Sequence, residues 1–363
     1  VAAFLAVGFL DASGAAAAVV TRGPYLQRGS PTGAVVRWCT DVNTESRVRY
    51  GLTPTSLTGI ADGASGVTDH AVTVSGLSPD TVYYYSVGTS TQTLAGGDST
   101  FFFRTHPFVG TAVPTRIWVI GDAGTANASA QAVRNAYLTF AGTRATDAWL
   151  MLGDNAYDSG TAEQFTGCYA PTWGRFKNRT RPAPGNHDYR TTGAGAYFAY
   201  FGKAAGEPGK GYYSYDLGGW HVLVVNSNCG EIGGCKKGSA QELWVREDLA
   251  AHPAPCTLAM WHHPRFSYAE HGDDPSMRAI WKDLYDAGAE LVLSGHDHTY
   301  ERFAPMDAVG NADPQRGLRQ FVAGTGGRSL YKFVHVRDTS EVRENQTYGV
   351  LKLTLHSSSY DFQ

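Results

Sequence analysis

Side chains with oxygen or nitrogen donors follow five short segments of this chain. The segments RIWVI, DAWLML, RPAP, CTLAMW and ELVLS each have the apolar character of a buried strand or end at a small turn. The stretches that come next read GDAG (121–124), GDNAY (153–157), GNHD (185–188), HHP (262–264) and GHDH (295–298). Because the carboxyl ends of strands in an α/β sheet share one edge, we expect these groups to converge.

The converging groups predict a metal centre. Packed carboxylates without a cation would repel one another and shift toward neutrality. Mixed imidazole and carboxylate ligands suit iron, zinc or manganese, and no cysteine has the CxxC spacing of a structural zinc site. The donors are too many for one ion, which favours two ions about 3.5–4 Å apart that share a carboxylate. In an extended segment His296 and His298 point to the same side, so each can serve one ion.

The motif series resembles that of the metallophosphoesterases, and among them the purple acid phosphatases. Generic metallophosphoesterases begin with Asp-x-His, whereas this chain has Asp122-Ala-Gly. Tyr157 stands three residues after Asp154, where the purple acid phosphatases supply a phenolate to ferric iron. The resemblance extends over residues 22–363 and implies a catalytic domain with the αββα architecture of that superfamily.

The resemblance also implies roles for individual residues. The implied ligands are Asp122, Tyr157 and His298 for Fe(III), Asn186, His262 and His296 for a divalent Zn, Mn or Fe ion, and Asp154 as the bridge between them. His187 takes a position that in the family contacts the phosphate and can donate a proton. His271 matches a second phosphate-contacting histidine of the mammalian-type enzymes, whereas GHDHTYER (295–302) is similar to the plant-type enzymes.

The implied chemistry is hydrolysis of a small phosphorylated substrate by a hydroxide bound to the metals, at acidic pH. The expected activity is that of an acid phosphatase acting on phosphate monoesters. Phosphodiesters, or a particular monoester such as a nucleotide or phytate, are the alternative substrates, because the same ligands would serve them. A binding or adhesion protein with an inert α/β part is a further alternative, which the intact ligand set disfavours.

Several of these residues have simpler interpretations. Tyr157 is one of 20 tyrosines and a packed side chain is the alternative; for His271 it is a solvated loop position. His263 is expected to be structural or to line the pocket, and not to bind metal. Asp188 and Asp297 are expected to orient histidines and not to bind metal.

Strands and helices that would position these groups alternate from Arg116 onward, which predicts an α/β fold with some antiparallel strands. Helices are expected over 127–142, 239–252 and 276–289, and a hairpin over 212–227. Ser239, with Glu242 three residues later, predicts a capping box.

An all-β domain is expected before this part. Residues 22–105 contain short segments rich in β-branched and aromatic residues, separated by Gly, Pro, Asp and Ser turns. Trp38 and LSPDTVYYYSV (77–87) resemble a fibronectin type III-like β-sandwich. The predicted boundaries are therefore a sandwich over 22–105, a linker over 106–115 and the catalytic domain over 116–363.

Residues 1–21 are expected to be the remnant of a signal peptide. The apolar run VAAFLAVGFL is too short to span a bilayer and is followed by the small residues DASGAAAA. This predicts a secreted or extracytoplasmic protein without stable membrane insertion; a buried or disordered tail is the alternative. Export permits disulfides, and Cys229 and Cys235 flank a short glycine-rich loop, although five cysteines leave at least one unpaired. The net charge of −3 gives no reason to expect nucleic-acid binding, and the oligomeric state is not predicted.

Overall fold

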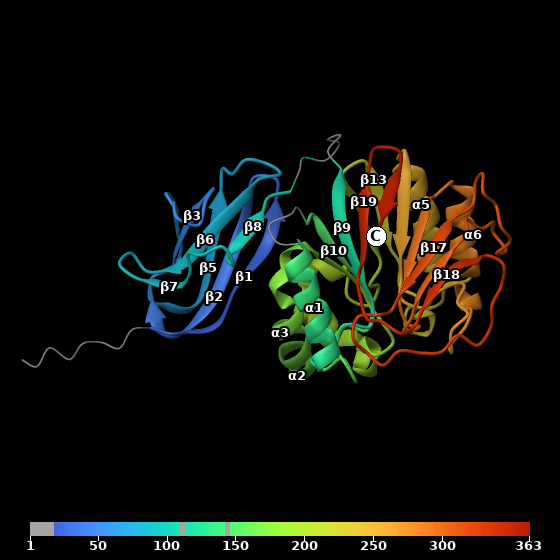
Figure 1. Cartoon of the computed structure of the whole chain (residues 1–363), viewed down its shortest axis with the longest axis horizontal. Coiled ribbons are helices and arrows are strands. Elements are labelled where there is room, and N and C mark those ends of the chain that lie inside the picture. Colours follow the sequence, from blue (N-terminus) through green and yellow to red (C-terminus); the bar gives the residue numbers. More distant parts are fainter. Residues whose placement is uncertain (1–17, 107, 109–113, 142–145) are drawn as a thin grey trace, which may run out of the picture.

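The structure, a computed structural model, describes residues 18–106, 108, 114–141 and 146–363. An all-β part lies beside a larger part that contains both helices and strands (Figure 1). The predicted signal segment, residues 1–21, and the predicted linker, residues 106–115, lie largely outside the described residues, so both remain predictions. Within the described ranges, no helix has the length and apolar character that crossing a membrane requires.

The all-β part is a sandwich of two antiparallel sheets. Its strands are β1 (Val20–Ser30), β2 (Gly33–Thr44), β3 (Arg47–Gly51), β4 (Gly59–Asp62), β5 (Val67–Ser75), β6 (Val82–Gly88), β7 (Thr93–Gly96) and β8 (Phe102–Arg104). One sheet has the order β1-β2-β5 and the other β4-β3-β6-β7, with β8 paired to β6. Trp38 is fully buried between the sheets, and its ring stacks on His70 with centroids 4.6 Å apart. The β-sandwich predicted from the sequence is confirmed.

Two further sheets form the centre of the larger part. The first contains β9 (Thr115–Ile120), β10 (Ala148–Leu152), β11 (Thr180–Ala183), β19 (Leu351–Leu355) and β20 (Tyr360–Phe362). The second contains β12 (Tyr213–Leu217), β13 (Trp220–Val224), β14 (Cys256–Met260), β15 (Leu291–Ser294), β16 (Tyr300–Phe303), β17 (Arg319–Ala323) and β18 (Ser340–Glu344). Their orders are β11-β10-β9-β19-β20 and β12-β13-β14-β15-β17-β16-β18. The predicted hairpin is the antiparallel pair of β12 and β13.

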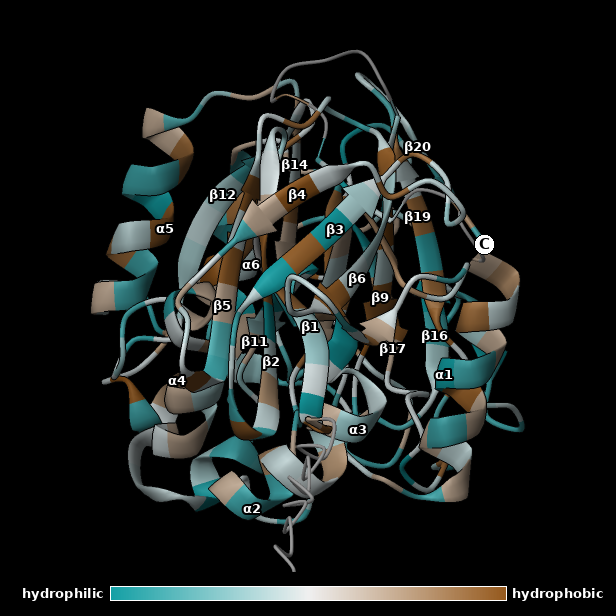
Figure 2. Ribbon diagram, turned by 90° about the vertical axis from the view of Figure 1, so that its left-hand side faces the viewer, coloured by the Kyte–Doolittle hydropathy of each residue, from teal (hydrophilic) through white to brown (hydrophobic). Residues whose placement is uncertain are grey.

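Alternate side chains of the central strands pack into different cores. In β9, Ile117 and Val119 face the core between the two sheets, whereas Trp118 and Ile120 pack with the helices outside the first sheet. The helices are α1 (Ala128–Ala141), α2 (Ala162–Gln164), α3 (Ala170–Thr172), α4 (Gly195–Phe201), α5 (Ala240–Ala251) and α6 (Arg278–Asp286). Figure 2 shows α5 and α1 on opposite sides of the molecule with the strands between them. This is the αββα arrangement expected from the sequence.

The start of α5 differs in one detail from the predicted capping box. The Ser239 side chain accepts a hydrogen bond from the Glu242 N–H, as expected. The Glu242 carboxylate accepts from the N–H of Gly238 (2.8 Å) and not from that of Ser239. The reciprocal half of the box is therefore shifted by one residue, and it still satisfies a backbone donor ahead of the helix.

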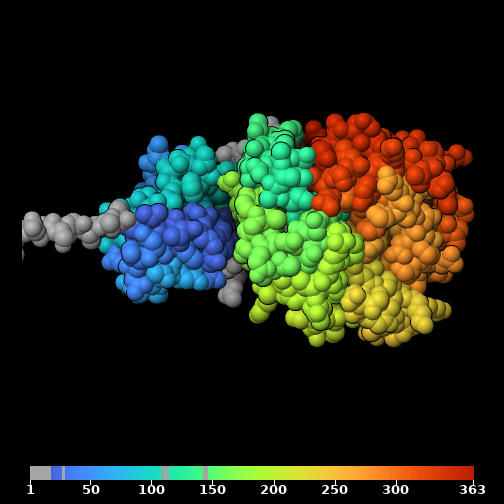
Figure 3. Space-filling model, turned by 90° about the horizontal axis from the view of Figure 1, so that it is seen from below, coloured from blue at the N-terminus to red at the C-terminus, as the bar shows by residue number. Residues whose placement is uncertain are grey.

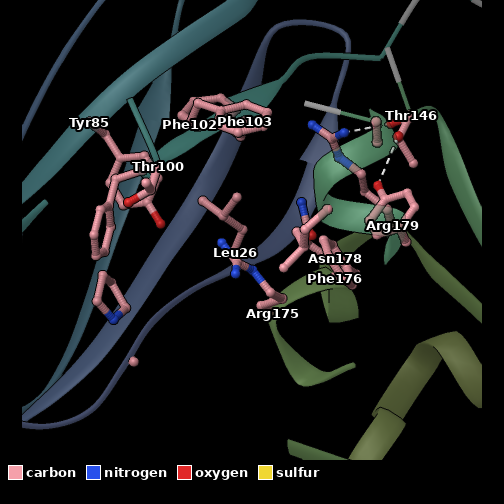
Figure 4. A pocket seen from close by; sticks show the side chains of 16 residues that line it. Leu26, Tyr85, Thr100, Phe102, Phe103, Thr146, Arg175, Phe176, Asn178 and Arg179 are labelled. Atoms are coloured by element: carbon pink, nitrogen blue, oxygen red, sulfur yellow. Dashed lines mark hydrogen bonds between the residues drawn. The ribbon is translucent and has the colours of Figure 1, made fainter. Parts of the chain in front are cut away.

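The β-sandwich packs directly against the larger part, as the space-filling view shows (Figure 3). Arg179, in the 3₁₀ helix Gly174–Arg179, is buried at this contact and donates to the carbonyl oxygens of Thr146 (2.5 Å) and of Arg104 in β8. Aromatic side chains of both parts line a cavity of about 340 Å³ beside it (Figure 4). A buried guanidinium bonded to both parts fixes one against the other at this point.

Candidate metal centre

The loops that follow five parallel strands converge at one edge of the two sheets. Strands β9, β10 and β11 run parallel in the first sheet, and β13, β14, β15 and β17 run parallel in the second. Ligand atoms of Asp122, Asp154 and His262 lie within 4.8 Å of one another, and so do those of His262, His263 and His296. The structure therefore brings together the donor-bearing loops in the way that the sequence predicts.

Three of the predicted ligands have a left-handed backbone. Within the described residues, only five residues other than glycine have positive φ, and they include Asp122 (58°), Asp154 (51°) and His296 (66°). This conformation is uncommon for residues with a Cβ and costs about 1–3 kcal/mol, so the surrounding structure must impose it.

Two glycines allow the loops to approach closely. A Cβ on Gly153 would lie 2.4 Å from Nδ1 of His262, and a Cβ on Gly185 would lie 2.2 Å from Oδ1 of Asp154. Any side chain at either position would displace a predicted ligand. In these two motifs the glycine that precedes the polar residue is thus required by packing.

The ring orientation of two histidines leaves a nitrogen facing the centre. His262 donates from Nδ1 to the carbonyl oxygen of Leu152 (2.7 Å), and His298 donates from Nδ1 to that of Ser329 (2.7 Å). In the neutral rings, the Nε2 atoms therefore carry the lone pairs. Nε2 of His262 lies 3.0 Å from Oδ1 of Asn186, 3.2 Å from Nδ1 of His296 and 3.3 Å from Oδ1 of Asp154.

Tyr157 lies in this cluster, on the side of Asp122 and His298. Its hydroxyl donates to Oδ1 of Asp122 (3.0 Å) and is 3.3 Å from Nε2 of His298. Burial raises the pKa of Tyr157 well above 10.0, and the charges of Asp122 and Asp154 raise it further. The structure therefore contains the expected contact of Tyr157 with the site. The side chain is buried, so it is also packed in the interior.

Burial also changes the protonation of the histidines. It lowers the pKa of His262 to about 3, and it lowers that of His296. For His298 burial again lowers the pKa, but the hydrogen bond and charge of Asp122 outweigh it and the net shift is upward. Neutral His262 and His296 are in the state that binds a metal ion.

His187 and His271 stand at the rim of the cluster. The backbone N–H of His187 donates to Oδ1 of Asp154 (2.9 Å), and its ring donates from Nδ1 to the carbonyl oxygen of Asp158 (2.6 Å). The exposed His271 stacks on His296 with ring centroids 4.2 Å apart. Both rings are thus adjacent to predicted ligands and accessible to a substrate.

Asp188 and Asp297 do not orient histidine rings, which corrects the expectation from the sequence. Asp188 accepts from the N–H of Gly185 (2.8 Å) and from the N–H (3.2 Å) and side-chain amide (3.0 Å) of Asn155. Burial, together with the charge of Asp154, raises the pKa of Asp188 to about 7. This side chain joins the second and third motif loops to each other.

The Asp297 side chain likewise forms hydrogen bonds with a neighbouring loop, the one that follows β14. It accepts from the N–H of His271 (3.0 Å) and from the hydroxyl of Ser267. It therefore fixes the backbone that carries His271. His263, expected to line the pocket, lies 2.8 Å from the Ser227 hydroxyl through Nδ1, and its ring is 4.3 Å from that of His296.

Two side chains at the site were not predicted from the sequence. Arg328 lies over the Tyr157 ring, 4.9 Å from its centroid, and pairs with Asp158 at 2.9 Å. Tyr331 stacks on His298 with centroids 4.0 Å apart. Both come from the loop after β17, which begins with GTGG (324–327) and repeats the pattern of a strand followed by a small turn. That pattern was the signal by which this sixth loop was recognisable.

Comparisons with known proteins agree with this arrangement. A family model described as calcineurin-like phosphoesterase matches residues 115–300, and one described as the N-terminal domain of purple acid phosphatases matches residues 22–105. Purple acid phosphatase 15 of Arabidopsis thaliana is 28% identical over 333 residues, which cover 80% of this chain and 59% of that protein. Probable purple acid phosphatase 20 of the same plant is 25% identical, with 77% and 68% covered.

A solved structure has a similar fold. The purple acid phosphatase from yellow lupin (Lupinus luteus) seeds superposes with a TM-score of 0.72 at 19% identity, covering 94% of this chain and 71% of that one. At this identity the likeness concerns the fold. The matched part of the chain spans 59% of the length of purple acid phosphatase 15, which is less than two thirds. Similarity alone therefore does not establish the activity of that whole protein for this chain.

Proposed function

The chain belongs to the calcineurin-like phosphoesterase family, and from this premise we propose that it hydrolyses phosphate monoesters as an acid phosphatase. The reaction takes place at a dinuclear centre of Fe(III) and a divalent Zn, Mn or Fe ion. The substrate is a small phosphorylated molecule. The purple acid phosphatase relatives and the N-terminal family match support this branch of the family.

The orientation of His262 carries the proposal. Its Nδ1 proton is committed to a backbone carbonyl, and burial keeps the ring neutral. The lone pair on Nε2 therefore points at the oxygens of Asn186 and Asp154, both of which are acceptors, at 3.0 and 3.3 Å. Acceptors that face one another in a buried site are stabilised by a cation between them. The donor set thus fits a metal ion.

The ligand assignment divides the cluster into two sides joined by one carboxylate. In the proposal, Fe(III) is held by Asp122, Tyr157 and His298, the divalent ion by Asn186, His262 and His296, and both by Asp154. On one side Tyr157 contacts both Asp122 and His298. On the other side His262 contacts both Asn186 and His296. When bound, the two cations would supply Lewis acidity, which lowers the pKa of water and neutralises charge on the phosphoryl oxygens.

His187 and His271 would contact the phosphoryl group and handle the proton of the leaving group. Nδ1 of His187 is fixed by the Asp158 carbonyl, so Nε2 is the atom that meets the substrate. His271 is held through its backbone by Asp297, and its ring stacks on that of His296. In their protonated forms, these rings would stabilise the phosphoryl charge or protonate the departing oxygen.

We also propose that the protein is exported. The disulfide between Cys229 and Cys235 supports this, because such bonds persist in oxidising compartments. The remaining cysteines, Cys39, Cys168 and Cys256, are free thiols.

The substrate class is tested by steady-state kinetics on metal-replete protein. We would compare kcat/KM for p-nitrophenyl phosphate with that for bis(p-nitrophenyl) phosphate from acid to alkaline pH. The proposal requires a preference for the monoester and an acidic optimum. A preference for the diester, or an alkaline optimum, would assign the same site to a phosphodiesterase. A strong preference for one nucleotide or for phytate over p-nitrophenyl phosphate would assign it to a specific nucleotidase or phytase.

A further inference from the structure

Besides the cavity lined by aromatic side chains, a polar groove lies between the β-sandwich and the larger part. It has a volume of about 700 Å³ and shares Asn178 with the neighbouring cavity of Figure 4. Its polar lining includes Arg37 from β2, Lys177 and Arg181 around the start of β11, Lys203, Tyr200 and Tyr215. Arg181 is near the amino end of β11 and the metal-site loop follows its carboxyl end, so the groove and the metal centre lie at opposite ends of this strand.

The charged side chains that line this groove are all positive. No carboxylate is among its lining residues. Of the cations, Arg37 pairs at 2.9 Å with the exposed Asp69, outside the groove. Within the described part of the chain, neither Lys177 nor Arg181 has a carboxylate within ion-pair distance. A cleft lined by charges of one sign concentrates its field and raises the local concentration of counter-ions.

The cations are supported by aromatic rings rather than by acids. Nζ of Lys177 lies 4.1 Å from the centroid of the Tyr200 ring, and the guanidinium of Arg181 lies 5.2 Å from that of Tyr215. The Tyr215 hydroxyl and Nε of Arg37 are buried, and neither has a hydrogen-bond partner among the described residues. Buried polar atoms are nearly always paired, so an acceptor bound in the groove would satisfy donors that the described residues leave without a partner.

The electrostatic environment of Lys177 also favours a bound anion. Burial, together with the charges of Arg22 and Arg37, lowers the pKa of Lys177 to about 8. An anion in the groove would oppose both effects, because it compensates the charge that burial and the neighbouring cations disfavour. Lys177 is thus held where its charge is costly in the free protein and favourable in a complex.

We propose that this groove binds a small anion that carries two or more phosphoryl groups. Cations contributed by both parts of the chain suit several separated negative charges better than one. Guanidinium groups match phosphoryl oxygens in geometry, and lysine adds a compact charge. A volume of about 700 Å³ accommodates a small molecule. The bound anion would bridge the sandwich and the larger part, and this binding does not depend on the hydrolytic activity.

The first test locates binding on the unaltered protein. Methylenediphosphonate is the probe, because its P–C–P bridge is not hydrolysed. The rate of Lys177 acetylation by acetic anhydride is followed by mass spectrometry, with exposed Lys236 as the internal reference. The probe should slow Lys177 acetylation about tenfold, as expected for one charge-assisted contact, and leave Lys236 unchanged. Equal rates with and without the probe would overturn the proposal.

The second test compares two double variants of the full chain. Lys177→Gln with Arg181→Gln removes two groove cations, and Lys236→Gln with Lys237→Gln removes two cations from an exposed loop. Both keep the metal centre, so any binding of the probe there is common to them. Calorimetric titration should give at least about tenfold weaker binding for the groove variant alone. Equal affinities, or equal Lys177 protection by sulfate at matched ionic strength, would refute a site for several phosphoryl groups.

Discussion

Replacing Asp188 with Ala tests whether loop-to-loop hydrogen bonds hold the metal centre in place. The carboxyl group accepts three hydrogen bonds, from the N–H groups of Gly185 and Asn155 and from the Asn155 amide. Asp188 is fully buried, so its removal leaves three buried donors without a partner. Each unpaired donor costs about 1–3 kcal/mol. With some relaxation of the loops, the free energy of unfolding should fall by about 3–6 kcal/mol.

The assay is thermal unfolding together with metal affinity. At about 2–4 °C for each kcal/mol in a unit of about 150–250 residues, this loss corresponds to a fall in Tm of about 6–24 °C. Asp154 and Asn186 lie on the two loops that Asp188 joins, so metal affinity or kcat/KM should fall about 10–100-fold.

Asp307 provides a matched control for this change. It also accepts three hydrogen bonds, from the N–H groups of Val309 and Asn311 and from the Asn311 amide, but on a solvent-exposed loop. Because water replaces the lost partner there, Asp307→Ala should change stability by only about 0.5 kcal/mol. If the two variants lose equal stability, or if Asp188→Ala keeps full metal affinity, the reasoning is refuted.

Three other predictions concern colour, pH and redox state. Tyr157→Phe in iron-loaded protein should lose the visible absorption band of a phenolate bound to Fe(III); a retained band would contradict the ligand assignment. Burial lowers the pKa of His221, but its hydrogen bonds to Asp248 and Asp216 outweigh that effect and raise the pKa above 6.5. The contribution of His221 to the free energy of unfolding is therefore complete below pH 6.5 and declines as pH rises through the folded-state pKa. His221→Gln should flatten the urea midpoint between pH 6 and 9, and an unchanged profile would count against the pair. Reducing Cys229–Cys235, which closes a short loop, should cost about 2 kcal/mol in denaturant titrations, and no change would show that the loop is held by other contacts.

The central strands were predictable because burial on both faces leaves its mark on the sequence. All five residues of β10 and all five of β14 are buried, which requires continuous apolar runs. Helices α1, α5 and α6 lie within the predicted ranges. Apart from RPAP, which overlaps β11, the segment between β10 and β12 was not assigned, because α2, α3 and α4 are too short for a periodic pattern. They are held instead by an aromatic cluster that includes Phe165, Tyr169 and Phe201.

The polar loops were predictable for a different reason. Metal ligation restricts residue types, and the residues after five strands show that restriction directly. Hydrogen-bond partners in the loops depend instead on the path of the backbone, which spacing does not encode. The expectation that Asp188 orients a histidine was therefore wrong. Arg328 and Tyr331 were missed because they follow the turn at 324–327, and their residue types alone do not indicate metal or substrate binding.

The central claim is that two metal ions occupy this cluster, one on each side of Asp154. It is tested most directly by anomalous diffraction from crystals of the metal-replete protein, with data collected above and below the iron and zinc absorption edges. The account predicts two peaks about 3.5–4 Å apart, one beside Tyr157 and His298 with an iron signal and one beside His262 and His296. A single peak, or metal bound away from Asp154, would contradict it.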